Sequence, residues 1–441
     1  MRAALERHFS IRGAGSDVRT EVIAGATTFL TMAYIVVVNP AILKAAGMPV
    51  GAVITATCLS AAFASFLMGW YGRLPIGVAP GMGTNAYFAF TVCGTLGHSW
   101  QTALGAVFIS GVLFLVLSVT GVRERIIEAI PDSMKHAIAA GIGIFIAFVG
   151  LINAKIIVDR PTVLVGLGDV TSYEALVTFV GLVACGVLLA RGVRGALLYG
   201  IAIATALAMV VGVAKVPEQI VAMPPSMSET FLAMDLKAAL GVGVLELIFA
   251  FAFVDLFDSI ATLIGVADQG GMLAKKEEGT TYLPGATRAL SADAVGTMVG
   301  AAFGTSTVTS YVESTSGIAA GGRTGLTAVV TGLGFLAMLF VSPLIGVVPW
   351  QATAPVLIIV AVFMLKNLVK IAFDDLTEAI PAVVACLAIP LTFSISDGLA
   401  LGFVTYPTVK LLAGRHRDIH PMMVVLALLF LAKFFFLGHG G

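Results

Sequence analysis

The chain has 441 residues, of which 59% are hydrophobic and 11% are charged, and its mean hydropathy is +1.02. Soluble domains carry roughly 25% charged residues, so this composition excludes an ordinary soluble protein. The formal net charge of +0 gives no electrostatic basis for binding nucleic acid. The apolar runs are continuous and about 20 residues long, which predicts membrane-spanning helices rather than the alternating strands of a barrel.

The first 20 residues are charged and lack an early apolar core, so they predict a cytoplasmic lead rather than a cleavable signal peptide. Fourteen apolar segments follow, with expected boundaries at 21–39, 51–69, 78–95, 102–121, 135–152, 173–191, 194–213, 241–266, 287–303, 306–320, 325–347, 353–369, 377–394 and 396–413. A last apolar run at 421–437 contains Lys433 and either lies in the membrane interface or forms a fifteenth crossing.

Lys and Arg residues set the expected orientation, because cytoplasmic loops are enriched in them. With a cytoplasmic N-terminus and fourteen crossings, nineteen of them fall on the cytoplasmic side and five on the outer side. We therefore expect both ends of the fourteen-segment array in the cytoplasm. The four cysteines lie inside apolar runs without metal-ligand spacing, and the histidines lie in loops or ends, so no metal site is expected.

An internal similarity relates LSAAFASFLMG (Leu59–Gly69) to LSADAVGTMVG (Leu290–Gly300). Each is followed by a polar, glycine-rich span that predicts an interrupted helix, at Gly77–Phe90 and at Phe303–Ala319. Because each half contains seven segments, the two halves have inverted topologies. Inverted repeats with interrupted helices at matching positions are typical of secondary transporters, whose substrates bind at those interruptions.

Asp255, Asp258 and Glu313 lie in segments predicted to cross the membrane, where an unpaired charge costs several kcal/mol and indicates function. Asp255 and Asp258 are three residues apart, so we expect them on one helix face. Glu313 follows a run rich in Ser, Thr and Gly, so we expect it to open a half-helix. The alternatives are a tightly packed helix interface around Glu313 and structural hydrogen bonding by Asp255 or Asp258.

The side chains near the two interruptions suggest the class of ligand. A carboxylate such as Glu313 accepts two hydrogen bonds side by side, which suits a flat heterocycle with adjacent N–H donors. Tyr87 and Tyr311 could stack on such a ring, although packing is the simpler role for both. Asn85, near the expected start of the first half-helix, offers a donor and an acceptor, and Thr309 is a further candidate for substrate binding.

The stretch FDDLTEAIPA contains three carboxylates, Asp374, Asp375 and Glu378, at an expected cytoplasmic helix start. Carboxylates in a first helical turn commonly cap the helix and interact favourably with its dipole. A structural role is therefore the simpler interpretation of these residues.

The sequence resembles the AzgA-like branch of the nucleobase:cation symporter-2 family, the hypoxanthine, guanine and adenine permeases. The motifs that carry this resemblance span nearly the whole chain: Thr27–Leu43, Ala79–Phe90, Phe253–Gly265, Gly304–Gly332 and Asp374–Ala382.

The resemblance implies an all-α fold of two inverted seven-segment repeats with broken third and tenth segments. It implies a core domain of residues 21–121 and 241–347, a gate domain of residues 122–213 and 348–413, and a C-terminal apolar segment at 414–441. It also implies uptake of purine bases across the bacterial inner membrane, driven by protons and often performed by a homodimer in the lipid bilayer. No cofactor is expected, and Na⁺ stays open as the coupling ion.

Residue roles are also implied by the resemblance. Asp255 matches the position linked to substrate binding and proton coupling, with Asp258 as a second candidate for coupling. Glu313 matches the residue that hydrogen-bonds the base, and Asn85 matches a polar position of the third segment. Asp375 and Glu378, in the DDLTEA motif, belong to a family element near the gate.

Two other function classes were weighed. An anion carrier of the same fold is disfavoured because Glu313 stands where such a carrier needs a neutral or basic residue. A membrane enzyme or purine sensor is disfavoured because the sequence shows no set of catalytic residues and its loops are too short for an output domain.

Overall fold

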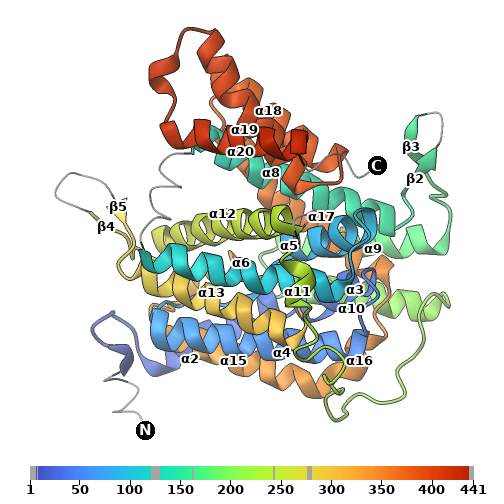
Figure 1. Cartoon of the computed structure of the whole chain (residues 1–441). Coiled ribbons are helices and arrows are strands. Elements are labelled where there is room, and N and C mark those ends of the chain that lie inside the picture. Colours follow the sequence, from blue (N-terminus) through green and yellow to red (C-terminus); the bar gives the residue numbers. More distant parts are fainter. Residues whose placement is uncertain are drawn as a thin grey trace.

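The computed structural model describes residue 6 and residues 8–120, 130–160, 163–241, 244–275 and 281–436. Within them the chain is built from helices, with six strands of two to four residues (Figure 1). Each of the fourteen expected segments contains described helix. The prediction of an all-α polytopic membrane protein is therefore confirmed.

Among its described residues the first half contains ten helical elements and three strands. In chain order they are α2 (Val18–Met32), α3 (Ile35–Lys44), α4 (Val50–Leu67), the π-helical η1 (Met68–Gly72), β1 (Val78–Pro80), α5 (Met82–Ala86), the π-helical η2 (Tyr87–Thr95), α6 (Trp100–Thr120), α8 (Asp132–Asn153), β2 (Ile157–Arg160), β3 (Leu164–Leu167), α9 (Tyr173–Ala190) and α10 (Ala196–Val210).

The second half repeats the arrangement of two long helical segments, a short strand and a short helix, but its hairpin β4–β5 lies between the first two of its long helices. It contains α11 (Leu236–Ala239), α12 (Leu245–Gln269), β4 (Ala274–Lys275), β5 (Thr281–Tyr282), α13 (Ala286–Phe303), β6 (Val308–Ser310), α14 (Ser314–Ala319), α15 (Gly325–Met338), η4 (Leu339–Val341), α16 (Ser342–Gly346), α17 (Trp350–Leu365), η5 (Lys366–Lys370), α18 (Leu376–Leu391), α19 (Ile395–Leu412), η6 (His416–Asp418) and α20 (Pro421–Phe436).

Eight described helical runs have the length and apolar composition to cross a membrane. Three shorter apolar helices accompany them at Ala196–Val210, Leu376–Leu391 and Pro421–Leu431. The third and tenth segments fall outside this set because strands interrupt them, as their Gly, Pro, Ser and Thr content predicts. The first half-helix begins at Met82, two to three residues before the expected start.

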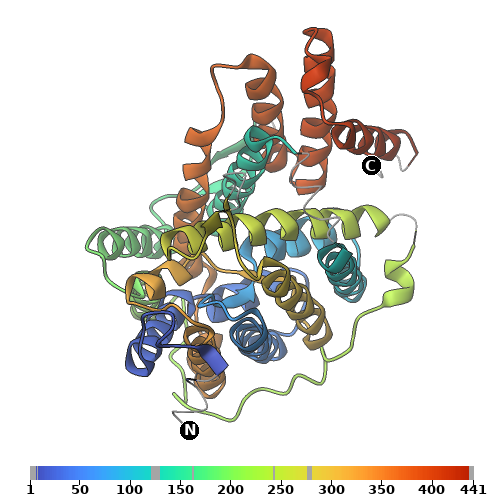
Figure 2. The same ribbon diagram turned by 90° about the vertical axis from the view of Figure 1, so that its left-hand side faces the viewer.

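The helices pack in two groups. In one group α2, α4, α6, α12, α13 and α15 contact one another, and in the other α8, α9, α10, α17, α18 and α19 do so. Both views show α12 between α18–α20 on one side and α2, α4 and α15 on the other (Figure 2). The last helix, α20, packs on α19, where the Phe403 and Phe430 rings stack with centroids 5.6 Å apart.

The two halves meet at the paired strands β1 and β6. These strands are antiparallel, with Ala79 opposite Thr309 at the centre of the ladder. Each strand occupies the same place in its own half, after the second long helix and before a short helix. Equivalent strands that pair antiparallel are the outcome expected of inverted repeats, so the pairing supports that prediction.

One hydroxyl holds the first residue of each of these strands. Ser65 Oγ donates to the Val78 carbonyl oxygen and accepts from the Val78 N–H, both at 3.0 Å. Thr297 Oγ1 makes the same two bonds to Val308, at 2.8 and 3.1 Å. A hydroxyl both donates and accepts, so one side chain satisfies two backbone groups where water is scarce.

Two glycines allow the halves to approach closely at a second point. A Cβ on Gly325, the first residue of α15, would lie 1.9 Å from the Gly69 carbonyl oxygen, and one on Gly69 would lie 2.3 Å from the Gly325 oxygen. Because both obstacles are backbone atoms, no change of rotamer could make room for a side chain. This contact requires glycine at both positions.

We expect Gly325→Ala to lower the thermal unfolding temperature of the detergent-solubilised protein, because overpacking typically costs about 1–3 kcal/mol. The matched control is Gly186→Ala in α9, where an added Cβ meets no described atom within 4 Å. There alanine should leave the unfolding temperature equal or higher, since it favours helix by about 1 kcal/mol over glycine. Equal unfolding temperatures for the two variants would contradict the close-contact explanation.

Candidate functional site

A cavity lies where strand β6, the residues that lead from it into α14 and the start of α5 face α12, α8 and α17. The space within it, its open mouth included, is about 610 Å³. Both groups of helices contribute to its walls. The cavity is therefore placed where relative movement of the two groups would change access to it.

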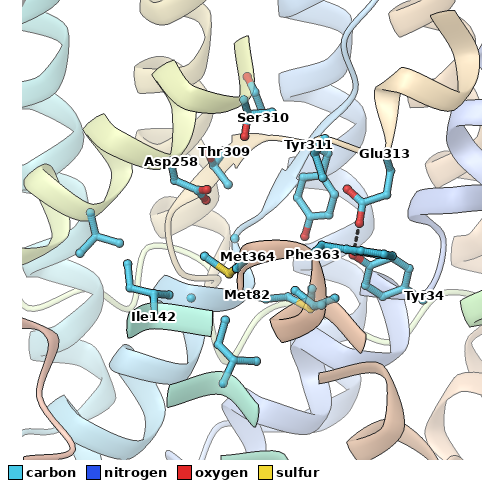
Figure 3. Close-up of a pocket in the computed structure, with 17 residues that line it drawn as sticks. Tyr34, Met82, Ile142, Asp258, Thr309, Ser310, Tyr311, Glu313, Phe363 and Met364 are labelled. Atoms are coloured by element: carbon cyan, nitrogen blue, oxygen red, sulfur yellow. Dashed lines mark hydrogen bonds between the residues drawn. The ribbon is translucent and has the colours of Figure 1, made fainter. Parts of the chain in front are cut away.

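One wall of the cavity is polar. It includes two carboxylates and two phenols, from Asp258, Glu313, Tyr34 and Tyr311, and three residues with aliphatic hydroxyls, Thr262, Thr309 and Ser310. Figure 3 shows Tyr311 between the two carboxylates, with Asp258 on one side and Glu313 on the other. The described residues that line the cavity include no Lys, Arg or His.

The other wall is apolar. Ile142 and Ile146 reach the cavity from α8, and Val360, Phe363 and Met364 reach it from α17. Apolar and aromatic side chains opposite a few polar groups form the usual surroundings of a flat heterocyclic ligand. The sequence gives no sign of this wall, because apolar residues in apolar helices carry no distinguishing signal.

Glu313 immediately precedes α14 and so opens the half-helix, as the sequence predicts. Its carboxylate does not cap that helix. Instead, the Tyr34 hydroxyl donates to Glu313 Oε1 at 2.6 Å. Tyr34 lies at the break between α2 and α3, so the carboxylate is held from the first segment of the chain.

Further hydrogen bonds hold Thr309 and Tyr311, which line the cavity in and directly after strand β6. The Tyr311 hydroxyl donates to the Pro80 carbonyl oxygen on the opposing strand. Thr309 Oγ1 lies 3.0 Å from Ser259 Oγ on α12, and Ser259 donates to the carboxylate of Asp293 on α13. Thr309 and Tyr311 thus line the cavity and are also tied to its frame.

Asp255 is placed differently from Asp258. Val254, Asp258 and Thr262 form the stripe of α12 that lines the cavity, whereas Asp255 is buried and accepts from Thr297 Oγ1 at 3.3 Å. Residues three apart differ by about 60° around a helix axis, which is enough to separate these two environments. The prediction that Asp255 and Asp258 share one helix face therefore does not hold for their surroundings. Asp258 therefore faces the cavity, and Asp255 faces α13.

Asn85 and Tyr87 also lie outside the cavity walls. Asn85 is fully buried and donates to Asn39 Oδ1 at 2.9 Å, and Asn39 in turn donates to Thr305 Oγ1. Tyr87 is fully buried with its ring 5.2 Å from that of Phe251 in an edge-to-face contact. In this structure both residues hold helices together beside the site.

Sequence reasoning assigned no role to Tyr34 or Asp293. Asp293 is fully buried and accepts from the Ser259 and Ser310 hydroxyls. A carboxylate inside an expected membrane segment is the signal that singled out Asp255, and it applies equally to Asp293. Tyr34 offered only a weaker signal, a phenol within a long apolar run.

The carboxylates at the start of α18 lie away from the cavity. Asp375 caps the helix by accepting from the Thr377 N–H at 2.9 Å and forms an ion pair with Arg415 at 2.6 Å. Glu378 pairs with the buried Lys410 at 2.8 Å and accepts from the Tyr406 hydroxyl. These contacts connect α18 with α19 and the residues that follow it, in agreement with a structural role.

The hydrogen bonds from Thr377 and Arg415 lower the pKa of Asp375 to about 2. An unfolded aspartate has a pKa of about 3.9. The stabilisation that the charged Asp375 gives to the folded state is therefore fully present above that pH and is lost as the pH falls through 2. We expect Asp375→Asn to lower the thermal unfolding temperature by a constant amount between pH 5 and 8. The difference from wild type should shrink as the pH approaches 2.

The control for this pH series is Asp374→Asn, because Asp374 makes no hydrogen bond or ion pair within the described part of the chain. Thermal unfolding of the detergent-solubilised variants measures both effects. A gap between wild type and Asp375→Asn that closes between pH 8 and 5 would show that another group controls this contact.

The chain is similar in sequence to a known protein family and to several transporters. The Xan_ur_permease model, described as "Permease family", matches residues 19–401. Adenine permease AdeP of Escherichia coli is 44% identical, covering 98% of this chain and 96% of its own. Guanine/hypoxanthine permease PbuG of Bacillus subtilis is 43% identical, covering 98% and 100%. Nucleobase transporter PlAzg2 of Paenibacillus larvae is 33% identical, covering 89% and 77%.

Among solved structures, the transmembrane domain of the cyanobacterial bicarbonate transporter BicA superposes with a TM-score of 0.63. It covers 87% of this chain and 97% of its own, at 13% sequence identity, so the likeness concerns the fold alone. The family match and the relatives concern the sequence over almost its full length. The chain therefore belongs to this permease family, the nucleobase:cation symporter-2 family, and is a multi-pass membrane transporter rather than an enzyme.

Proposed function

We propose that the protein is a purine nucleobase permease that takes up hypoxanthine or guanine, with adenine as a further candidate, together with protons. Its location is the bacterial inner membrane, with a cytoplasmic N-terminus. The relatives support the substrate class, since they are named adenine and guanine/hypoxanthine permeases. The site supports it independently through its chemistry.

The observation that carries the proposal is the pair of carboxylates, Asp258 and Glu313, on either side of Tyr311 in one cavity. Carboxylates accept hydrogen bonds, so the ligand has to present N–H donors. A purine presents N–H donors on its six-membered and five-membered rings and has flat faces. The Tyr311 ring and the apolar wall of Phe363 and Met364 offer surfaces against which such faces can pack.

The same carboxylates argue against an anion as substrate. The fold is shared with a bicarbonate transporter, but the described lining of this cavity contains two acidic side chains and no basic one. An anion bound between Asp258 and Glu313 would be repelled by both. A neutral base with N–H groups meets no such penalty.

Proton coupling is assigned to Asp258, because it faces the cavity whereas Asp255 faces α13. A proton on Asp258 removes one of the two charges of the site and so favours binding of a neutral base beside Glu313. Release of that proton on the cytoplasmic side restores the charge and lowers the affinity. Asp255 supports the site from behind, through Thr297 and the strand that Thr297 holds.

We assign the two groups of helices to a core (21–121 and 241–347) and a gate (122–213 and 348–413). The core carries the polar wall of the cavity and the gate carries the apolar wall. An elevator-like displacement of the core along the gate would move the carboxylates and the base together from one side of the membrane to the other. The gate helices leave apolar side chains exposed for the bilayer or for a second copy of the chain.

Proteoliposomes containing the purified protein should accumulate labelled hypoxanthine when an inward proton gradient is imposed, and a protonophore should abolish the accumulation. Asp258→Asn should lose this gradient-driven accumulation, because it removes the titrating group, yet retain exchange of labelled for unlabelled base. Glu313→Gln should lose about tenfold or more in affinity, the effect expected when a hydrogen bond to a charged group is weakened.

The matched control is Asp255→Asn, the same change on the same helix. It should weaken the fold through Thr297 without separating exchange from accumulation. If the well-expressed wild-type protein transports no purine, the proposed function is wrong. Wild-type accumulation by Asp258→Asn would refute the coupling role alone.

A further inference from the structure

Tyr34 contacts the carboxylate that is proposed to bind the base. Its ring is fully buried, it lines the cavity, and its hydroxyl donates to Glu313 Oε1 at 2.6 Å (Figure 3). The break between α2 and α3 places this side chain beside the half-helix of the opposite repeat. The hydrogen bond joins the first segment of one half to the third segment of the other.

The partners of this bond have little freedom to separate, because α14 lies tightly against α2. Thr31 Oγ1 lies 2.9 Å from Ser316 Oγ, and a Cβ on Gly317 would lie 2.0 Å from Thr28 Oγ1. The backbone that carries Glu313 is therefore held at a set distance from the backbone that carries Tyr34. Separation of Glu313 from Tyr34 therefore requires rotation of a side chain and not movement of the backbone.

A phenol has one hydrogen to donate, and here Glu313 receives it. The two oxygens of a carboxylate can receive two parallel N–H groups side by side, but one lone pair of Oε1 is already taken by the Tyr34 hydroxyl. A base with a single N–H on the facing edge can use Oε2 without competition from Tyr34. A base with two adjacent N–H groups has to share Oε1 with the Tyr34 hydroxyl, so it gains less from its second donor.

Purine bases differ in this respect. Guanine presents N1–H and the 2-amino group side by side, hypoxanthine presents N1–H alone, and adenine presents its 6-amino group beside an unprotonated ring nitrogen. We propose that Tyr34 is a specificity-determining residue, which reserves one oxygen of Glu313 and so removes the advantage that guanine would otherwise have over hypoxanthine and adenine. This inference rests on the proposed purine transport.

The test is the KM for uptake of guanine, hypoxanthine and adenine by wild type and by Tyr34→Phe, which keeps the ring and removes the hydroxyl. In the wild type, guanine should have a KM no lower than that of hypoxanthine. In Tyr34→Phe, the KM for guanine should fall about tenfold relative to that for hypoxanthine, because Glu313 can then receive both donors. The maximal rates should change far less than this ratio.

Two controls separate selectivity from a general loss of structure. Tyr199→Phe makes the same change at an exposed position of α10 and should leave the KM ratio as in wild type. In a Glu313→Gln background, Tyr34→Phe should no longer alter the ratio, since the carboxylate through which it acts is gone.

The outcomes distinguish this inference from the proposed function. If the wild-type protein transports none of the three bases, both the proposed function and this inference are wrong. Transport with the same KM ratio in wild type and Tyr34→Phe, or an equal rise in KM for all three bases, overturns the specificity role alone. If Tyr34→Phe does not fold, the wild-type ratio still decides, because a KM for guanine tenfold below that for hypoxanthine contradicts the inference.

Discussion

The antiparallel pairing of β1 with β6 is the interaction on which the rest of this structure depends. Extended backbone at membrane depth has no water to satisfy its N–H and carbonyl groups, so it persists only where protein supplies partners. Here each half supplies them to the other, and the hydroxyls of Ser65 and Thr297 complete the ladder. The pairing brings two regions more than 200 residues apart in sequence to one point, and the cavity lies there.

The carboxylates explain why so many hydroxyls surround this crossing. Carboxylates in this region need donors, and the neighbouring segments provide them: Tyr34 for Glu313, and Ser259 with Ser310 for Asp293. The Thr297 hydroxyl, which donates to the Val308 carbonyl, also lies 3.3 Å from the Asp255 carboxylate. The same side chains hold strand β6 and its flanking helices in position. Structural support and ligand chemistry therefore use one network, so a substitution that affects one affects the other.

Sequence reasoning predicted the class of fold and much of the site because the signals are local. Apolar runs and breaks at Gly, Pro, Ser and Thr located the segments, and the cost of a charge in the membrane singled out Asp255, Asp258 and Glu313. It could not decide between Asp255 and Asp258. That distinction depends on what packs against each side of α12, which is a property of the neighbouring helices.

By itself, therefore, the sequence determined the membrane class, the helical segments, the two interruptions and the resemblance to nucleobase permeases, and it singled out Glu313 as a candidate. The tertiary structure decided which polar residues reach the cavity, and it placed Asn85 and Tyr87 beside the site instead of in it. It also supplied Tyr34 and the apolar wall from α8 and α17. The physical reason is that these contacts join segments far apart in the chain. Hydrophobic periodicity indicates which face of a helix is buried, but it does not indicate which other helix packs against that face.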